Sequence, residues 1–462
     1  ELVMYYTVDV KWIYACLIGL ILALNLTACG GGFTPPATPT ADSAPDSRPV
    51  APSRELQKSL PEVCDCVLRF DHLNIEQGLS QSSVNVIFQD SRGFLWFGTE
   101  DGLNRYDGYT FKTYKPDPDV PESLSDRWIT AIVEDAEGYL WIGTRQGGLN
   151  RYDPRTETFK HYIHDASQPT SLSNDHINML YRDQANNLWV GTPDGLDRFD
   201  QTLGQFKRYL ATPSEVENAN KNRITAMLQD KRGQYWLGTS GGGLKKFDAE
   251  NDSFVTYLSN PENLNTISFD SITAIVEDEH AIMWVGTRNG LNRFDPSTGL
   301  FDRFMRPSTD LESPLPDNRA SDGSEPIETT DQENSISSNA VNALLIDVTG
   351  NLWIGTANGL NRYEPGKGFV QYYHDPTFSK SLSKNHVVSL YEDRSGTLWV
   401  GAYAGGVNIY DRQTDLFAYY RHDPLDPETI SDNTVIPIYV DSEGYAWIGT
   451  SNGLDRFNQQ TG

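Results

Sequence analysis

Four side chains in separate parts of the sequence have the chemistry to bind a sugar or another small polar ligand: Trp128, Arg145, Arg288 and Tyr403. Aromatic rings stack on apolar ligand surfaces, and a guanidinium group binds carboxylates with two parallel hydrogen bonds. Each of the four lies in a segment that differs between otherwise similar stretches of the chain. They are our candidate ligand-binding residues. The alternative, that they are solvated side chains at loop tips, stays open at the level of sequence.

The sequence carries no known catalytic or metal-binding motif. It contains no Gly-x-Ser-x-Gly, no His-Glu-x-x-His and no phosphate-binding glycine loop. His164, His374 and His422 each begin a His-Asp loop at the same place in a repeat, which indicates a structural role. We therefore predict no enzyme activity, no cofactor and no metal in this segment. Tyr403 with Arg288 is the one pair we nominate for lyase chemistry.

Composition restricts the classes of partner. The chain has 37 Lys and Arg against 63 Asp and Glu, a net charge of −26. Such a chain repels phosphate backbones, so nucleic acid is not an expected partner. Hydrophobic residues make up 38% of the chain, which is enough for a large core. Four cysteines cannot form a disulfide framework for 462 residues, and Cys64 and Cys66 form no convincing zinc site.

The N-terminal segment has the features of an export signal. Residues 12–26 form an apolar run that is short for a membrane span and suits a signal peptide. The run ends in Leu-Thr-Ala-Cys-Gly, which resembles the lipobox of bacterial lipoproteins. The resemblance implies a signal peptide over 1–28 and lipid attachment at Cys29, so we expect an exported protein tethered to a membrane of the cell envelope. The alternative is an uncleaved anchor followed by a chance cysteine. Residues 29–63, rich in Pro, Ala, Ser and Thr, are the expected disordered tether.

The remainder, residues 64–462, repeats one pattern eight times. A tryptophan recurs every 45–48 residues, apart from one spacing of 69 that contains an acidic, Ser-rich insertion at 307–336. An aspartate stands six residues before each tryptophan, and Val or Ile stands six residues before each aspartate. The repeats are centred on Trp96, Trp141, Trp189, Trp236, Trp284, Trp353, Trp399 and Trp447.

Each repeat predicts four short strands and no helix. The first strand is typified by 129–135, a D-x-x-G turn and the tryptophan strand follow, and the fourth strand is typified by 159–162. Four strands in a period near 47 residues are typical of a β-propeller blade, and tryptophan is the expected filler between blades. The fold class is therefore all-β, a β-propeller.

The sequence leaves two numbers of blades open. Residues 67–73 match the fourth-strand pattern but precede the first repeat, so they can complete the last blade of a ring. We favour seven closed blades, with 417–421 in a second, incomplete ring. Eight blades closed through 67–73 are the alternative.

The string D-x-x-G-x-LW(I/V)GT-x-x-GL-x-R(Y/F)D resembles the two-component regulator propeller repeat over residues 84–458. The resemblance implies the exported sensor region of a hybrid histidine kinase, compatible with a homodimer, that binds products of polysaccharide breakdown. More repeats, a membrane helix and a kinase are then expected in the full-length protein. Two alternatives are a lyase on a propeller scaffold, as in the similar streptogramin lyases, and a stand-alone lipoprotein that binds glycans or proteins.

Overall fold

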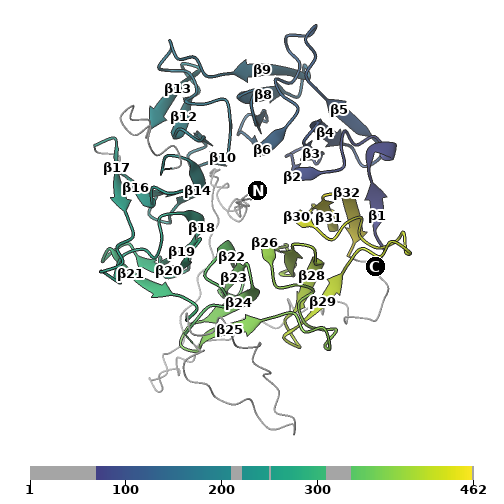
Figure 1. The fold of residues 1–462 in the computed structure, drawn as a ribbon. Helices are drawn as coiled ribbons and strands as arrows, with labels where there is room; N and C mark the ends of the chain where they lie inside the picture. Colours follow the sequence, from purple (N-terminus) through teal and green to yellow (C-terminus); the bar gives the residue numbers. More distant parts are fainter. Residues whose placement is uncertain (1–68, 210–220, 249–250, 308–333, 460–462) are drawn as a thin grey trace, which may run out of the picture. The chain divides into compact units, whose positions relative to one another are not determined.

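The computed structural model describes residues 69–209, 221–248, 251–307 and 334–459, which form a ring of eight four-stranded antiparallel sheets (Figure 1). The expected signal peptide and tether, Cys29, Cys64, Cys66 and most of the insertion at 307–336 lie outside these residues. Within the described part, no helix is long and apolar enough to cross a membrane. The all-β propeller that the repeats predict is confirmed.

The strands follow the repeats closely. Blades one to four are formed by β2 (Val84–Gln89), β3 (Leu95–Thr99), β4 (Gly102–Tyr106), β5 (Phe111–Tyr114), β6 (Ile129–Glu134), β7 (Leu140–Thr144), β8 (Leu149–Asp153), β9 (Thr158–Tyr162), β10 (Met179–Arg182), β11 (Leu188–Gly191), β12 (Leu196–Asp200), β13 (Gln205–Tyr209), β14 (Ile224–Gln229), β15 (Tyr235–Thr239), β16 (Leu244–Asp248) and β17 (Ser253–Tyr257). Blades five to seven are formed by β18 (Ile272–Glu277), β19 (Met283–Thr287), β20 (Gly290–Asp295), β21 (Leu300–Phe304), β22 (Val341–Ile346), β23 (Leu352–Thr356), β24 (Gly359–Glu364), β25 (Gly368–Tyr372), β26 (Val387–Glu392), β27 (Leu398–Ala402), β28 (Gly406–Asp411) and β29 (Leu416–Tyr420). Blade eight contains β30 (Val435–Val440), β31 (Tyr445–Thr450), β32 (Gly453–Asn458) and β1 (Asp71–Leu73), and a 3-10 turn η1 (Ile75–Gln77) follows β1.

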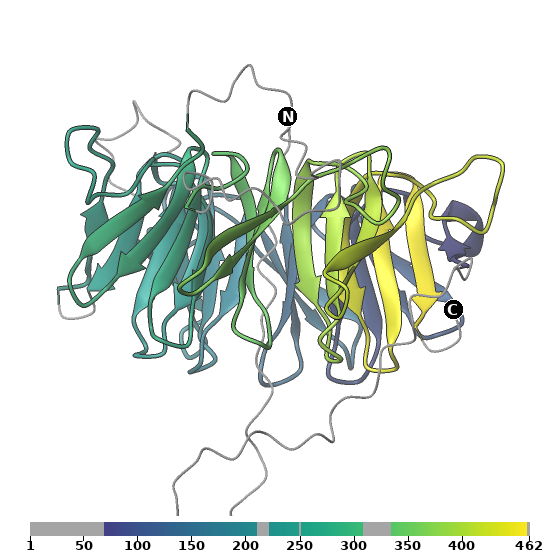
Figure 2. The ribbon, with the colours of Figure 1, turned by 90° about the horizontal axis from the view of Figure 1, so that it is seen from below.

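In blades one to seven, the chain runs from the innermost strand outwards, as in the order β2-β3-β4-β5 (Figure 1). The strands run between two faces of the ring (Figure 2). Turns between the first and second strands lie on one face. Connections from the second to the third strand and from the fourth to the next blade lie on the other, because each antiparallel strand reverses direction. A backbone hydrogen bond from Gly102 to Arg127 joins two such connections.

The aspartate and tryptophan of each repeat bind one another. In all eight blades the indole Nε1 donates to Oδ2 of the aspartate six residues earlier, at 2.7–3.2 Å. The other oxygen accepts backbone N–H groups of the turn, as Asp183 Oδ1 does from Ala185 and Asn187. Asn186 and Ala281 take the left-handed conformation where other blades have glycine, with φ of 65° and 60°. The fixed spacing therefore satisfies the polar atom of a buried indole.

Each tryptophan also joins its blade to the next. Trp96 of blade one contacts Tyr152 of blade two with ring centroids 5.1 Å apart, and Trp353 contacts Tyr410 of blade seven at 4.7 Å. Trp447 of blade eight contacts Tyr106 of blade one at 5.5 Å, which completes the circle. The predicted role of tryptophan as filler between blades is confirmed.

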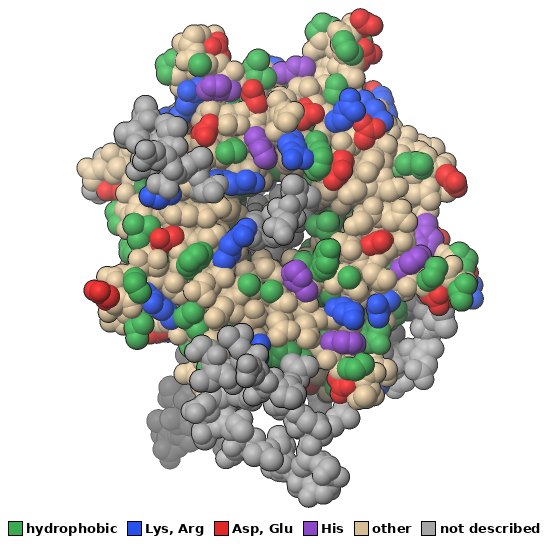
Figure 3. Space-filling view, viewed as in Figure 1, with side chains coloured by type: hydrophobic (Ala, Val, Ile, Leu, Met, Phe, Trp, Pro, Cys, Tyr) green, Lys and Arg blue, Asp and Glu red, His purple; other side chains and the backbone are tan. Residues whose placement is uncertain are grey.

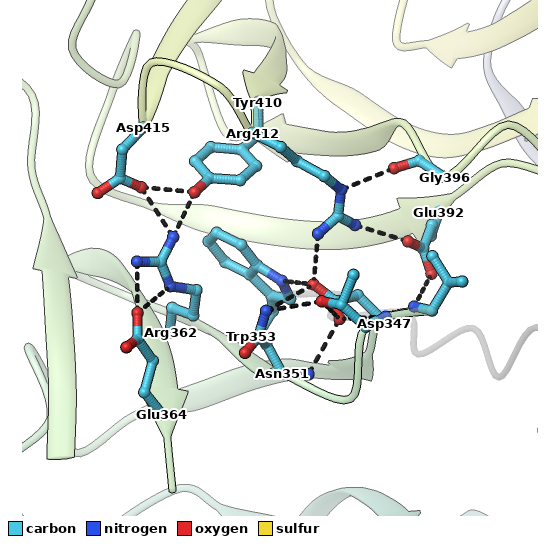
Figure 4. Close-up of polar contacts among 12 residues, drawn as sticks. Asp347, Asn351, Trp353, Arg362, Glu364, Glu392, Gly396, Tyr410, Arg412 and Asp415 are labelled. Carbon is cyan, nitrogen blue, oxygen red and sulfur yellow. Dashed lines mark hydrogen bonds and ion pairs between the residues drawn. The ribbon is translucent and has the colours of Figure 1, made fainter. Parts of the chain in front are cut away.

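The junction between blades six and seven has additional charged contacts on the face of the first turns (Figure 4). The guanidinium of Arg412 lies 2.8 Å from Asp347 and 2.6 Å from Glu392, and it also donates to the carbonyl of Gly396. Glu392 in turn accepts the backbone N–H of Val348. Arg412 thus binds the turn aspartate of the neighbouring blade and holds the two first turns together.

A second polar motif links the loop before a blade to its third strand. In five blades the backbone N–H of a serine in the loop before the blade donates to the Oδ1 atom of an asparagine on the third strand. An example is Ser337, which donates to Asn361 at 2.7 Å. The Asn361 amide donates back to Ser337 Oγ and to the carbonyl of Ile354. In blade three the asparagine is replaced by Asp197, whose Oδ2 accepts from Ser173 and whose buried Oδ1 has no hydrogen-bond partner.

We expect Asp197→Asn to stabilise the protein by about 1–3 kcal/mol at pH 8, because the amide supplies the donor that a carboxylate lacks. Burial raises the pKa of Asp197 to about 6. A raised carboxyl pKa means that ionisation costs stability, and this cost grows as pH rises from about 4 through 6. The gain should therefore be about half as large at pH 5 as at pH 8. Urea unfolding at both pH values measures it, with Asn361→Asp as the reverse control that should destabilise at pH 8. A gain that is equal at both pH values would contradict the prediction.

The ring closes in blade eight, through β1. Asp71, His72 and Leu73 pair with Arg456, Asp455 and Leu454 of β32. The preference for seven blades is therefore wrong, and the eight-bladed alternative is correct. The assignment of 417–421 to a second ring is also wrong, since β29 is the outer strand of blade seven. The fourth-strand pattern does not say which blade it completes, because all fourth strands look alike.

Candidate functional site

One face of the ring carries the long connections and the residues that differ between blades. Two positions 17 residues apart recur there, one directly before the inner strand and one directly after the second strand. A backbone N–H of the second position donates to the carbonyl of the first in six blades, at 2.8–3.3 Å. These six pairs are Trp128–Arg145, Arg223–Ser240, Ser271–Arg288, Ala340–Ala357, His386–Tyr403 and Thr434–Ser451. We call the residues at these positions in all eight blades the axial mouth, because the inner strands lie closest to the ring axis (Figure 1).

All four candidate residues lie in the axial mouth. Trp128 and Arg145 form one pair, in which the guanidinium lies 4.2 Å from the centroid of the indole ring. The backbone hydrogen bond from Arg145 to Trp128 fixes their register. A guanidinium at this distance over an indole gains about 0.5–1 kcal/mol at an exposed site. Arg145 is therefore pre-positioned, and the residue is half-buried.

Tyr403 forms a second aromatic group, on blade seven. Its ring lies 5.5 Å from that of His386, and its side chain is 55% exposed. Burial lowers the pKa of His386, so this imidazole is neutral at neutral pH. The two rings are inclined by 43°, so the exposed Tyr403 ring is the surface suited to stacking.

Tyr403 and Arg288, the pair nominated for lyase chemistry, lie two blades apart in the ring order. Arg288 lies on blade five, where its N–H donates to Ser271 and its side chain is exposed. Blade six, with Ala340 and Ala357 at the axial mouth, lies between them. Among the described residues no hydrogen bond or ion pair connects Tyr403 to Arg288, and Tyr403 faces His386 instead.

Two members of the axial mouth were missed by sequence reasoning, His176 and Arg223. Burial lowers the pKa of His176, and the positive charges of Arg223 and Arg145 lower it further. A shallow pocket of about 400 Å³ is lined by Arg145, Gln146, Asn174, Asp175 and His176. The constant offset of 17 residues between the two mouth positions is the signal that would have found both. Positions 128 and 145 are separated by this offset, and so are positions 176 and 193 and positions 223 and 240.

The histidines that begin the His-Asp loops are structural, as predicted. The Nδ1 atoms of His164, His374 and His422 lie 2.7–2.8 Å from the carbonyl eight residues later, and their backbone N–H groups donate to Asp175, Asn385 and Asn433. No cluster of three or more His, Cys, Asp or Glu side chains that could hold a metal occurs in the described ranges.

The chain matches the family model described as "Two component regulator propeller" at residues 78–101, 123–146, 171–194, 219–241, 335–358 and 381–404. These segments contain the inner two strands of six blades together with their axial-mouth positions. The same family model thus matches six of the eight repeats.

A curated relative, Histidine kinase P4 of Formosa agariphila, is 62% identical over 42 residues, which are 9% of this chain and 3% of the kinase. The structure described as the extracellular domain of the hybrid two component system BT3049 from B. thetaiotaomicron is 22% identical, with a TM-score of 0.33. The similarity covers 86% of this chain and 66% of that one. The Dos1 propeller is 12% identical, covers 85% of this chain and 94% of its own, and has a TM-score of 0.54.

This chain thus spans less than two thirds of the length of the first two of these proteins. The Dos1 likeness concerns the propeller fold alone, because the identity is low. The repeat with its D-x-x-G turn and tryptophan strand recurs from blade to blade in the same register. The family model matches this repeat in six of the eight blades. The chain therefore belongs to the two component regulator propeller family.

Proposed function

We propose that this propeller is the exported, non-catalytic ligand-sensing region of a two-component signalling system, and that its axial mouth recognises a glycan fragment. The observation that carries the proposal is the contrast between scaffold and mouth. The Trp–Asp hydrogen bond is identical in all eight blades, whereas the mouth positions hold Trp128, Arg145, His386, Tyr403 and other residues that differ from blade to blade. Variation on a rigid scaffold is typical of binding surfaces.

The chemistry of the mouth suits a sugar better than it suits a reaction. The exposed ring of Tyr403 is available for stacking, and Trp128 with Arg145 offers a second aromatic ring and a fixed donor. The nominated lyase pair is separated by a blade, which removes the specific argument for catalysis. The membership in a regulator family and the short, highly identical match to a histidine kinase support a signalling role.

Export and membrane attachment are part of the same proposal. Cys29 would carry the lipid and residues 29–63 would tether the propeller to the membrane. A homodimer is the expected assembly of such a sensor. Fractionation of cells that express a Cys29→Ser variant checks the anchor, and a variant that stays in the membrane fraction would contradict it.

We expect a Tyr403→Ala variant to bind its glycan about tenfold more weakly, because an exposed stacking ring contributes more than 1 kcal/mol to a small interface. Isothermal titration calorimetry against a panel of neutral and acidic oligosaccharides measures the affinity. Tyr109→Ala is the matched control, since Tyr109 is 92% exposed on a turn between the third and fourth strands, on the opposite face. Absence of binding to every oligosaccharide, or an equal loss in both variants, would contradict glycan recognition at the mouth.

A further inference from the structure

The axial mouth is chemically asymmetric. Basic and imidazole side chains occupy it in consecutive blades, with Arg145 on blade two, His176 on blade three, Arg223 on blade four and Arg288 on blade five. The remaining blades carry small, aromatic or hydroxyl side chains, one further imidazole, His386, and one acid, Glu100. Figure 3 shows this face of the ring, with Lys or Arg and His side chains near its centre. A positive region at this position is unexpected on a chain with a net charge of −26.

The arginines of this region are not neutralised by the protein. Within the described ranges, no ion pair connects a carboxylate to Arg145, Arg223 or Arg288, whereas the strand residues Arg362 and Arg456 are each paired. Arg145 is instead held over the Trp128 ring, and Arg223 is exposed. An unpaired guanidinium fixed in place is a ready partner for a carboxylate or sulfate group.

The acidic side chains on the nearby loops are engaged in holding the loops. Asp126 accepts the N–H of Gln146 at 2.9 Å, Asp175 accepts that of His164 at 2.6 Å, and Asp194 accepts from the amide of Asn174 at 2.8 Å. These three carboxylates thus stabilise the loops, and none of them forms an ion pair with an arginine of the axial mouth in the described residues.

His176 reports the local potential. The charges of Arg223 and Arg145 both lower the pKa of this imidazole, so both guanidinium groups lie within electrostatic reach of its ring, and the adjacent pocket is lined by Arg145 and His176. The imidazole is therefore neutral at neutral pH and can donate or accept a hydrogen bond.

We propose that Arg145, His176 and Arg223 form an anion site on the axial mouth, which binds the carboxylate or sulfate groups of an acidic ligand and discriminates against neutral ones. This rests on the proposed ligand-sensing function and specifies its ligand class. Arg145 and Arg223 bind the anionic oxygens from two sides, and His176 lies between them on blade three. Trp128 keeps Arg145 in place before the ligand arrives, which lowers the entropic cost of binding.

Calorimetry with the full chain tests the site with three probes: trigalacturonate, its neutral counterpart trigalactose, and inorganic sulfate. We expect trigalacturonate to bind at least about tenfold more tightly than trigalactose, and its affinity to fall as salt is raised from low to high ionic strength. The double variant Arg145→Gln, Arg223→Gln should lose about tenfold or more in affinity for the acidic probe and much less in affinity for the neutral probe.

Arg232→Gln with Arg394→Gln is the matched control, because it removes the same two charges from exposed first turns on the opposite face. Its affinity for trigalacturonate should equal that of the wild type. The salt dependence of the wild type needs no variant, so the test does not depend on the folding of the double variant.

Equal binding of the acidic and neutral probes, or an equal loss in the control, would overturn the anion site and leave a glycan-sensing mouth intact. Binding of sulfate alone, lost in the double variant, would support the anion site and assign it to a free anion, against glycan recognition. Failure of all three probes to bind would overturn the site.

Discussion

Replacing Trp189 by alanine should lower the free energy of unfolding by about 3–5 kcal/mol. The side chain is 1% exposed and lies between blades three and four, with ring centroids 5.7 Å from Tyr209, 5.0 Å from Tyr235 and 6.2 Å from Phe247. Truncation leaves a cavity in a cluster that the ring geometry prevents from collapsing, since each blade is held by neighbours on both sides. Urea unfolding followed by far-UV circular dichroism measures the loss.

Truncation of Trp189 also removes a hydrogen-bond donor from Asp183. Its indole donates to Asp183 Oδ2 at 2.8 Å, and the hydroxyl of Tyr235 from the next blade donates to the same oxygen at 2.7 Å. Trp189→Phe keeps much of the packing but removes the indole donor. We therefore expect it to lower the free energy of unfolding less than Trp189→Ala does. The lost hydrogen bond should account for about 1–3 kcal/mol, in addition to the effect of the smaller side-chain volume. Tyr109→Ala is the exposed control and should change stability very little. A neutral Trp189→Ala variant would refute the packing account of the ring.

Much of this architecture could be predicted because each blade repeats the same local chemistry. The offset of six residues between aspartate and tryptophan predicted a turn and a filler residue, and both are present at Asp183 and Trp189. The hydrogen bond between them was not predicted, because a spacing says nothing about which atoms meet across a turn. The structure supplies that information for all eight blades.

The candidate site was predicted only in part. Residues after the second strand, such as Arg145 and Tyr403, stood out because they vary at a conspicuous position in the repeat. Their partners before the inner strand, such as His176 and Arg223, stand next to long loops of unequal composition, which hides the alignment. The sequence did not show that a blade lies between Tyr403 and Arg288, because ring position depends on the number of intervening blades, which residue type does not encode.

The number of blades is the clearest case of what repetition cannot determine. We expect Phe70→Ala to open the ring closure and to cost about 3 kcal/mol or more, as a truncated core phenylalanine does. Phe70 is 5% exposed and contacts Phe457 at 5.4 Å and Tyr420 at 6.0 Å. The strand that it precedes, β1, is the last piece of blade eight and comes from the opposite end of the sequence from β32.

Phe417→Ala is the matched control, because Phe417 is the equivalent residue of blade seven, 3% exposed and 5.3 Å from Tyr410. Its strand, β29, follows β28 directly in sequence, so its loss of packing cannot release a chain end. Hydrogen exchange should therefore show fast amide exchange in β32 for Phe70→Ala but not for Phe417→Ala. Equal protection of β32 in the two variants would mean that β1 does not hold the ring closed.

The closure also contains a titratable contact between an imidazole and a buried carboxylate. His72 Nδ1 lies 2.7 Å from Asp455 Oδ1, and Nε2 lies 2.6 Å from the carbonyl of Pro427. Both partners can only accept when Asp455 is ionised, so the imidazole is held in its protonated form. The hydrogen bond to Asp455 raises the pKa of His72 above its usual value of 6.5. The stabilisation is therefore complete below about pH 6.5 and is lost as pH rises through the folded-state pKa.

A variant with His72→Gln and Asp455→Asn removes this titration and places asparagine where blade six has Asn361. We expect the wild type to lose stability relative to this variant between pH 6 and pH 9, by up to about 1 kcal/mol, since the pair is partly exposed to solvent. Urea unfolding across this range measures the difference. A difference that stays constant with pH would show that the His72–Asp455 pair carries no charge. Ring closure would then depend on Phe70 and the β1–β32 backbone pairing alone, with no contribution from the His72–Asp455 contact.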